Sequence, residues 1–185
     1  LEGRPRIIHD IVDSAAAIIQ CYLPGDYGAE ALINLMYGEA NFSGKLPYTY
    51  PKYDGVIEFY DHPRSVDRSK NGGFDAYSPE YDFGFGLSYS KVTYSKPTLS
   101  NSTMHKNDSL KVSVLIQNES NQKTDEVVQL YLSDKYASFV PTGKSLKRFS
   151  KVTLQPNEQK ELVFYLCPED LKFADQTGMD MFEQG

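Results

Sequence analysis

The sequence lacks tryptophan and holds only two cysteines and three histidines in 185 residues. Cys21 and Cys167 stand far apart and form no CxxC pair, which excludes zinc-ribbon and thioredoxin-like motifs and leaves too few thiols for a disulfide framework. The histidines, His9, His62 and His105, are isolated, and no HExxH or GxSxG motif is present. The sequence therefore offers none of the common signatures of a metal centre or a serine nucleophile.

Long apolar runs and an excess of basic residues are missing as well. The 19 Lys and Arg are scattered and are outnumbered by 25 Asp and Glu, so no surface for a phosphate backbone is expected. The longest apolar stretches, 15–19 and 127–132, fall far short of the roughly 20 residues that cross a bilayer. We expect neither a nucleic-acid partner nor a membrane span. The 40% of hydrophobic residues nevertheless suffices for one core or two small ones.

The first 50 residues have the pattern of an α/β layer. Apolar residues from Ile7 to Ala15 recur at i, i+3 and i+4, which predicts an amphipathic helix over 5–15. The apolar run 16–23, closed by a Pro-Gly turn, predicts a buried strand. Helical spacing returns over 29–36, before a glycine at position 38 that suits a left-handed C-cap. One helix, one strand and a second helix are too few elements for a domain. We therefore expect this part to pack against polypeptide outside the sequence.

Between residues 39 and 88, Gly, Pro, Asn, Asp, Ser and Tyr dominate. Only 46–50 has strand character, and a glycine cluster at 70–73 predicts a flexible turn. A stretch this long predicts either a linker wrapped over a neighbour or a functional loop. We place this strap at 51–88.

Aromatic side chains in the strap allow a second interpretation. Phe59, Tyr60, Tyr77 and Tyr81 would suit stacking on a glycan, because a tyrosine offers a flat apolar face and a hydroxyl. The alternative function is therefore a non-catalytic carbohydrate-binding or adhesion module.

From residue 89 to 185 the apolar period becomes two. Every second residue is Leu, Val, Ile or Phe over 110–117, 128–133 and 162–167. The residues between them are mostly polar in the first two runs and are Val, Tyr and Cys in the third. Turn clusters at 118–125 and 155–159 separate these runs. The spacing predicts an all-β sandwich of immunoglobulin-like class.

Carboxylates are plentiful, but sequence spacing cannot show whether two of them form an acid/base pair. The candidates, chosen by residue type alone, are Asp26, Glu30, Glu39, Glu80 and Asp82. The simpler interpretation of Glu30 is a solvated helix side chain, and that of Asp26 is a helix N-terminal residue favoured by the dipole.

The string Phe83-Gly84-Phe85-Gly86-Leu87 contains GxG but lacks the third glycine and the apolar helix of a phosphate loop. We predict instead that the two glycines let the backbone pass close to a neighbouring surface. Phe83, Phe85 and Tyr89 would anchor it there.

Four Asn-x-Ser/Thr sequons begin at Asn41, Asn101, Asn107 and Asn118. About one is expected by chance from ordinary composition. Three of them fall in loops or strand ends of the predicted β module, which favours a surface that tolerates glycans.

Several longer motifs, in order and with suitable spacing, resemble the family-three glycoside hydrolases, the β-glucosidase and β-xylosidase group. Gly3-Arg4-Pro5, Tyr22-Leu23-Pro24-Gly25, Gly28-Ala29-Glu30-Ala31 and Gly38-Glu39-Ala40-Asn41-Phe42-Ser43-Gly44-Lys45-Leu46-Pro47-Tyr48-Thr49-Tyr50-Pro51 resemble the end of that family's α/β sandwich domain. Phe42 departs from the pattern, because the family usually has proline there. The stretches 77–81 and 83–89 are similar to the junction into the family's third domain. The stretches 126–134, 146–152 and 169–173 resemble its fibronectin type III-like domain.

The resemblance implies the C-terminal structural portion of an enzyme that hydrolyses terminal β-linked sugars with retention, without metal or organic cofactor. The family's nucleophile and acid/base lie upstream, so no catalytic, cofactor-binding or metal-binding residue is carried over. The implied organisation is a C-terminal piece of the α/β sandwich at 1–50, a strap at 51–88 and a fibronectin type III-like domain at 89–185 that lacks its last strands.

The same resemblance implies partners and a compartment. The remaining N-terminal domains of the parent enzyme would cover the first 50 residues, and a β-glycoside or oligosaccharide would bind through the parent. A homodimer formed through the uncovered apolar surfaces is the other expectation. Secretion or a periplasmic location follows from the family's substrates. Leu1 stands without an initiator Met or a signal-peptide pattern, which indicates a mature or excised piece.

Overall fold

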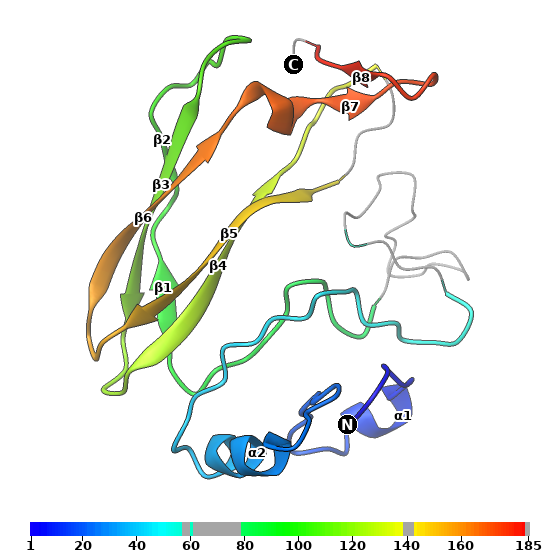
Figure 1. The fold of residues 1–185 in the computed structure, drawn as a ribbon, viewed down its shortest axis with the longest axis vertical. Coiled ribbons are helices and arrows are strands. Elements are labelled where there is room, and N and C mark those ends of the chain that lie inside the picture. Colours follow the sequence, from blue (N-terminus) through cyan, green and yellow to red (C-terminus); the bar gives the residue numbers. More distant parts are fainter. Residues whose placement is uncertain (57–59, 61–78, 139–142, 184–185) are drawn as a thin grey trace. The chain divides into compact units, whose positions relative to one another are not determined.

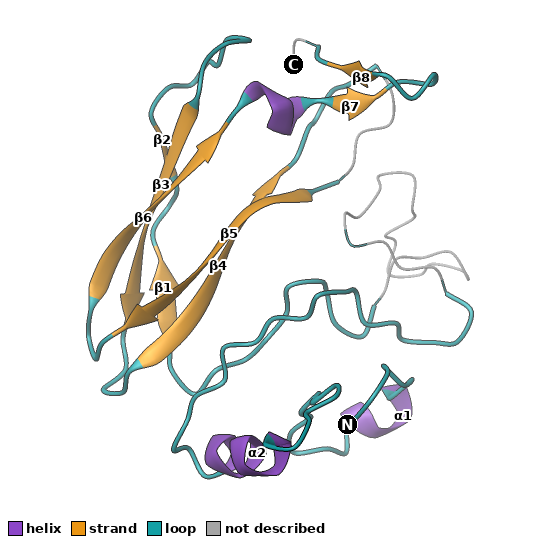
Figure 2. Cartoon of the chain, viewed as in Figure 1, coloured by secondary structure: helices purple, strands orange, loops and turns teal. Residues whose placement is uncertain are grey.

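The computed structural model describes residues 1–56, 60, 79–138 and 143–183. The chain divides after Tyr89 into two compact units. Helices lie in the first unit, and the strands, with one short 3-10 helix, lie in the second (Figures 1 and 2). In the described part of the chain, no helix has both the length and the apolar character needed to cross a membrane.

The first unit holds α1 (His9–Val12) and α2 (Gly28–Met36). The helix predicted over 5–15 is thus only four residues long. No strand forms at 16–23. Among the described residues the main-chain partner of this run is the N-terminus, where Glu2 makes a single parallel bridge with Tyr22. A buried parallel strand needs partners on both sides, and one short partner does not extend a ladder.

The predicted second helix begins at Gly28 and ends as expected. Gly38 has φ of 78°, and its N–H donates to the Leu35 carbonyl at 3.2 Å. Before the helix, a Cβ on Gly28 would lie 2.2 Å from Cβ of Pro24, so this turn requires glycine at position 28.

The second unit is a sandwich of antiparallel strands. β3 (Leu110–Asn118) pairs with β6 (Gln159–Leu166) on one side and with the short strands β1 (Val92–Tyr94) and β2 (Thr98–Leu99) on the other. β4 (Thr124–Leu132) pairs with β5 (Ser145–Leu154), with a register shift at Leu130/Tyr131. After the 3-10 helix η1 (Pro168–Leu171), β7 (Phe173–Ala174) pairs with β8 (Asp180–Met181).

The core of the second unit lies between β3–β6 and β4–β5. Its buried members alternate along the strands, as the sequence predicts: Val112, Ile116, Val128, Leu154, Phe164 and Leu166. The all-β character is therefore confirmed.

Asn118 is a buried polar residue at the end of this core. Its Nδ2 donates to the carbonyls of Gln122 at 2.7 Å and Gln155 at 3.0 Å, and its Oδ1 accepts the N–H and hydroxyl of Ser120. One amide thereby joins the turn after β3 to the turn after β5.

Candidate functional site

Two segments of the first unit, 41–50 and 79–89, run side by side in opposite directions (cyan and green in Figure 1). We call this pair the stem. Leu46 donates its N–H to the Phe85 carbonyl at 2.8 Å, and its own carbonyl accepts the N–H of Gly84 at 2.8 Å. Tyr50 exchanges main-chain hydrogen bonds with Tyr81 and Glu80 at 2.8 and 2.9 Å. The stem therefore closes the chain on either side of residues 51–78.

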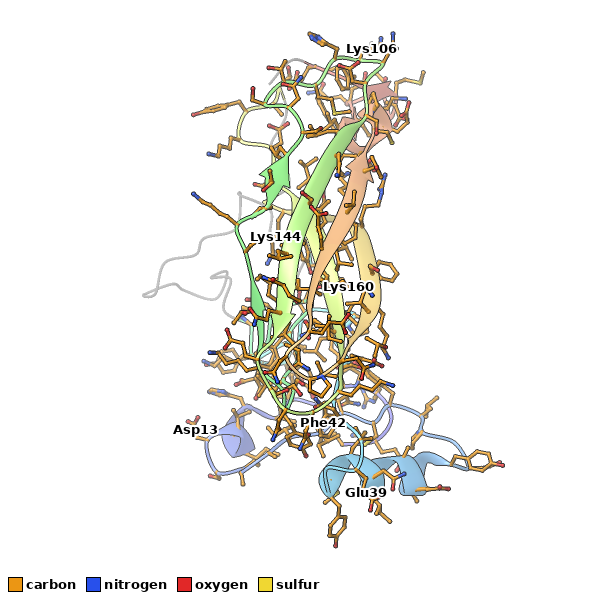
Figure 3. The ribbon with its side chains drawn as sticks, turned by 90° about the vertical axis from the view of Figure 1, so that its left-hand side faces the viewer. Asp13, Glu39, Phe42, Lys106, Lys144 and Lys160 are labelled. Atoms are coloured by element: carbon orange, nitrogen blue, oxygen red, sulfur yellow. The ribbon has the colours of Figure 1, made fainter. Side chains whose placement is uncertain are left out.

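Aromatic rings line the stem. Tyr81 stacks on Phe85 with ring centroids 4.9 Å apart and meets Tyr50 edge-on at 6.1 Å. Tyr48 lies 5.7 Å from Tyr50. Phe42, which stands where the family that the sequence resembles usually has proline, meets Tyr89 edge-on with ring centroids 5.5 Å apart. Figure 3 labels Phe42 and Glu39, just beyond α2. The rings pack on one another, which stabilises the stem beyond its few hydrogen bonds.

The two glycines of the GxG string let the stem segments approach closely, as predicted. Gly84 has φ of 79°, and a Cβ on Gly86 would lie 2.2 Å from the carbonyl oxygen of Gly44. Lys45 reaches back to donate to the Gly86 carbonyl at 3.2 Å. No L side chain larger than hydrogen fits at position 86 without backbone movement.

The pKa values of three stem tyrosines, Tyr48, Tyr50 and Tyr81, are raised. Burial raises the pKa of Tyr48 above its ordinary value, and Tyr22 beside it adds to the effect. Burial likewise raises the pKa of Tyr50 and of Tyr81. Tyr50, only 2% exposed, donates its hydroxyl to the Arg6 carbonyl at 2.6 Å. These phenols therefore serve packing and hydrogen bonding and not phenolate chemistry.

One of the five candidate carboxylates meets a histidine. Glu80 Oε2 lies 2.9 Å from Nδ1 of His9, the first residue of α1, and the His9 ring meets Tyr53 edge-on at 5.2 Å. The contact ties α1 to the stem. His9 is thus an anchor of the local fold, which its isolated place in the sequence does not reveal.

The other four candidate carboxylates lie at the surface. Asp26, Glu39 and Asp82 are solvent-exposed, and Glu30 is exposed in the first turn of α2, which agrees with the simpler interpretation of a solvated side chain. Asp26 precedes the helix by two residues, because Tyr27 occupies the N-cap. Among the described residues, no three His, Cys, Asp or Glu side chains gather as a metal site would require.

The aromatic stacking surface is described only in part. Phe59 and Tyr77 lie outside the described residues, as do His62 and the turn at 70–73. Tyr60 is 41% exposed, and its ring centroid lies 5.1 Å from that of Phe83. Tyr81 already stacks on Phe85.

A different surface of the first unit is apolar and uncovered. In α2, Ile33 is 54% and Met36 59% exposed, and Tyr27 and Tyr37 at its two ends are more exposed still. The sequence analysis predicts an uncovered apolar surface in the first 50 residues, because they hold too few elements to bury their own apolar side.

Comparisons with known proteins decide the family. Residues 1–89 match the model of the glycosyl hydrolase family 3 C-terminal domain, and residues 126–185 match that of the fibronectin type III-like domain. The chain is 39% identical over 178 residues to a putative beta-xylosidase of Formosa agariphila, covering 96% of this chain and 23% of that protein. It is 36% identical to a periplasmic beta-glucosidase of Salmonella typhimurium, covering 95% of this chain and 24% of that protein.

Residues 1–89 of this chain belong to the C-terminal domain of glycosyl hydrolase family 3.

Solved structures of this family agree. A beta-glucosidase of Listeria innocua in complex with gluconolactone superposes with a TM-score of 0.89 at 31% identity, over all of this chain and 27% of that one. A β-glucosidase from Erythrobacter marinus gives 0.89 at 32% identity, over 99% of this chain and 24% of that one. The chain thus spans about a quarter of the length of the family 3 relatives it matches.

Proposed function

We propose that this chain is a structural, catalytically silent C-terminal region of a larger family 3 β-glycosidase. The observation that carries the proposal is coverage: relatives named as β-xylosidase and β-glucosidase match almost all of this chain, yet the match occupies about a quarter of each of them. The parent enzyme would cleave terminal β-linked sugars with retention, using two carboxylates supplied by its other domains and no metal or organic cofactor.

The proposed partner of the first unit is the N-terminal part of the parent. The buried hydrophobic cluster belongs to the second unit, whereas among the described residues of the first unit the buried hydrophobic ones are Ile8 and Tyr50. A unit with so little core gains about 25 cal/mol for each Å² of apolar surface that another domain covers. The exposed face of α2 is the part that such a domain would cover.

We propose the domain limits that the sequence suggests. Residues 1–50 complete the parent's α/β sandwich, residues 51–88 strap the domains, and residues 89–185 form the fibronectin type III-like brace. Within the described residues β4 pairs only with β5, and a sandwich edge of nine residues calls for a partner strand. We therefore propose that this domain is completed by strands beyond those in the sequence.

An extracellular or periplasmic location fits the proposal. The Salmonella relative is named as periplasmic, and hydrolysis of oligosaccharides that arrive from outside would take place there.

The test is an activity assay on an aryl β-glycoside. The isolated chain is expected to show no turnover, the full-length parent to be active, and the parent truncated before Leu1 to lose activity or stability. Turnover by the isolated chain at a rate near that of the parent would disprove the proposal. Sedimentation of the isolated chain tests whether it forms a homodimer. A monomer that binds the separately produced N-terminal part of the parent supports the proposal that the parent covers the first unit. A stable dimer that does not bind that part supports self-association.

A further inference from the structure

The four sequons occupy very different surroundings. Asn118 is fully buried, and Nδ2 donates to two carbonyls. A glycan on this nitrogen would replace one of those hydrogens and place a sugar inside the sandwich. Asn41 lies half-buried in the stem, where Oδ1 accepts the Ser88 hydroxyl and the Tyr89 N–H, each at 3.0 Å. The interior position of Asn118 excludes a glycan in the folded chain, and the half-buried Asn41 is less accessible than an exposed loop residue.

The other two sequons lie in one exposed loop. Asn101 and Asn107 are both solvent-exposed in residues 100–109, between β2 and β3. Oδ1 of Asn101 accepts the N–H of Thr103 at 3.2 Å, which leaves Nδ2 out of that bond. Figure 3 labels Lys106 in this loop, at the end of the second unit.

The loop also borders a pocket with polar lining residues that could contact a sugar. A pocket of about 350 Å³ adjoins it, with Asn101, Thr103 and Asp108 among its lining residues. Amide, hydroxyl and carboxylate groups are the partners that sugar hydroxyls take, so the first sugar on Asn101 can rest against protein.

We propose that the loop 100–109 is the glycan-bearing site of this chain, with Asn101 and Asn107 as N-linked acceptors. The donor class is a lipid-linked oligosaccharide diphosphate. Nδ2 attacks the anomeric carbon, a carbon–nitrogen bond forms as the bond from that carbon to the phosphate oxygen breaks, one amide proton passes to a base of the transferase, and the lipid diphosphate leaves. No oxidation or reduction occurs. The proposal concerns modification and is independent of the proposed activity.

The test uses the full-length protein purified from its own cells. The denatured protein is first treated with a peptide-N-glycosidase in heavy-oxygen water, which turns each glycosylated asparagine into a mass-labelled aspartate, and is then digested with trypsin in ordinary water. Trypsin separates the four sequons into the peptides Ile7–Lys45, Val92–Lys106, Asn107–Lys111 and Val112–Lys123.

The expected result is a label in the Val92–Lys106 and Asn107–Lys111 peptides and none in the other two. Absence of label from both loop peptides, or a label in either remaining peptide, overturns the proposal. A label in only one loop peptide overturns the assignment of the other asparagine. As a matched control, a full-length protein with Asn101→Gln and Asn107→Gln made in the same cells should keep its fold and lose the mass that the glycosidase removes from the native protein.

Discussion

At the scale of single residues, Asn118 shows how one side chain can tie distant turns together. It is 0% exposed and uses both its amide hydrogens and its oxygen within the described structure. Replacing it removes the amide donor of the Gln155 carbonyl and the Oδ1 acceptor of the Ser120 N–H, and leaves the Gln122 carbonyl with only a 3.3 Å bond from the Ser120 hydroxyl. Losing partners around a buried amide costs more than the bonds contribute. The sequence places Asn118 in a turn cluster but gives no sign of its burial, because a sequon and a turn both suggest exposure.

We expect Asn118→Ala to lower the free energy of unfolding by about 3 kcal/mol. Asn121→Ala, in the same turn but exposed, should change it by under about 0.5 kcal/mol. Urea unfolding followed by circular dichroism measures both. Equal stabilities for the two variants would contradict the role given to the buried amide.

Asp170 is the second residue with a specific role, because it joins η1 to β5. It receives two hydrogen bonds from the Arg148 guanidinium, at 2.7 and 2.6 Å, and one from the Cys167 N–H at 2.8 Å. Burial by itself would raise the pKa of Asp170, but the bonds from Arg148 and Cys167 outweigh it and hold the pKa below its ordinary value.

A carboxyl whose pKa is lowered by folding contributes stability above its unfolded pKa, about 3.9, and loses that contribution as pH falls through the folded value. Asp170→Asn should therefore destabilise the chain by about 2 kcal/mol at pH 7, and the difference from the native chain should shrink below about pH 4. Urea midpoints measured across pH provide the check. Glu169→Gln, whose side chain is 68% exposed, is the control and should show neither effect. A difference that stays constant down to acid pH would count against the ionised pair.

At the scale of elements, the strands were the easier part to predict. Along most of β3 and β6 every second residue is apolar, because one face of each strand lies on the core. The sequence of β5 does not show a clear alternation of apolar residues. Its register against β4 shifts at Leu130/Tyr131, and the apolar Phe149 between its lysines is exposed. Only the resemblance at 146–152 pointed to it. The prediction of a strand at 16–23 was wrong. An apolar run indicates that a segment tends to be buried, but a β-strand also needs neighbouring strands for its main-chain hydrogen bonds.

The stem depends on Gly86. Gly86→Ala should destabilise the first unit by about 2 kcal/mol, because the added Cβ meets a main-chain oxygen that cannot rotate away. Gly44→Ala, on the opposite segment with open space around its Cβ position, is the control. Hydrogen exchange at the amides of Leu46 and Tyr50 reads the effect. Unchanged protection in the Gly86 variant would show that the stem tolerates a wider spacing.

At the scale of the whole molecule, the isolated chain and its proposed parent should differ in whether the apolar face of α2 is exposed. Ile33→Ser should be nearly neutral in the isolated chain, where the side chain is half exposed. In the full-length enzyme the same change should cost about 2 to 4 kcal/mol if another domain buries this side chain. Thermal unfolding of both proteins with and without the substitution gives the comparison. Equal effects in the two would mean that α2 stays uncovered in the parent.

The pairing of Tyr50 with Tyr81 has a consequence for how such proteins can vary. It fixes the entry and exit of the intervening chain at one place, so segments of different length can be exchanged there without altering the register of the stem. Closing a loop costs only about 0.6 kcal/mol more for each doubling of its length. This is therefore the position at which a segment of another length could be grafted.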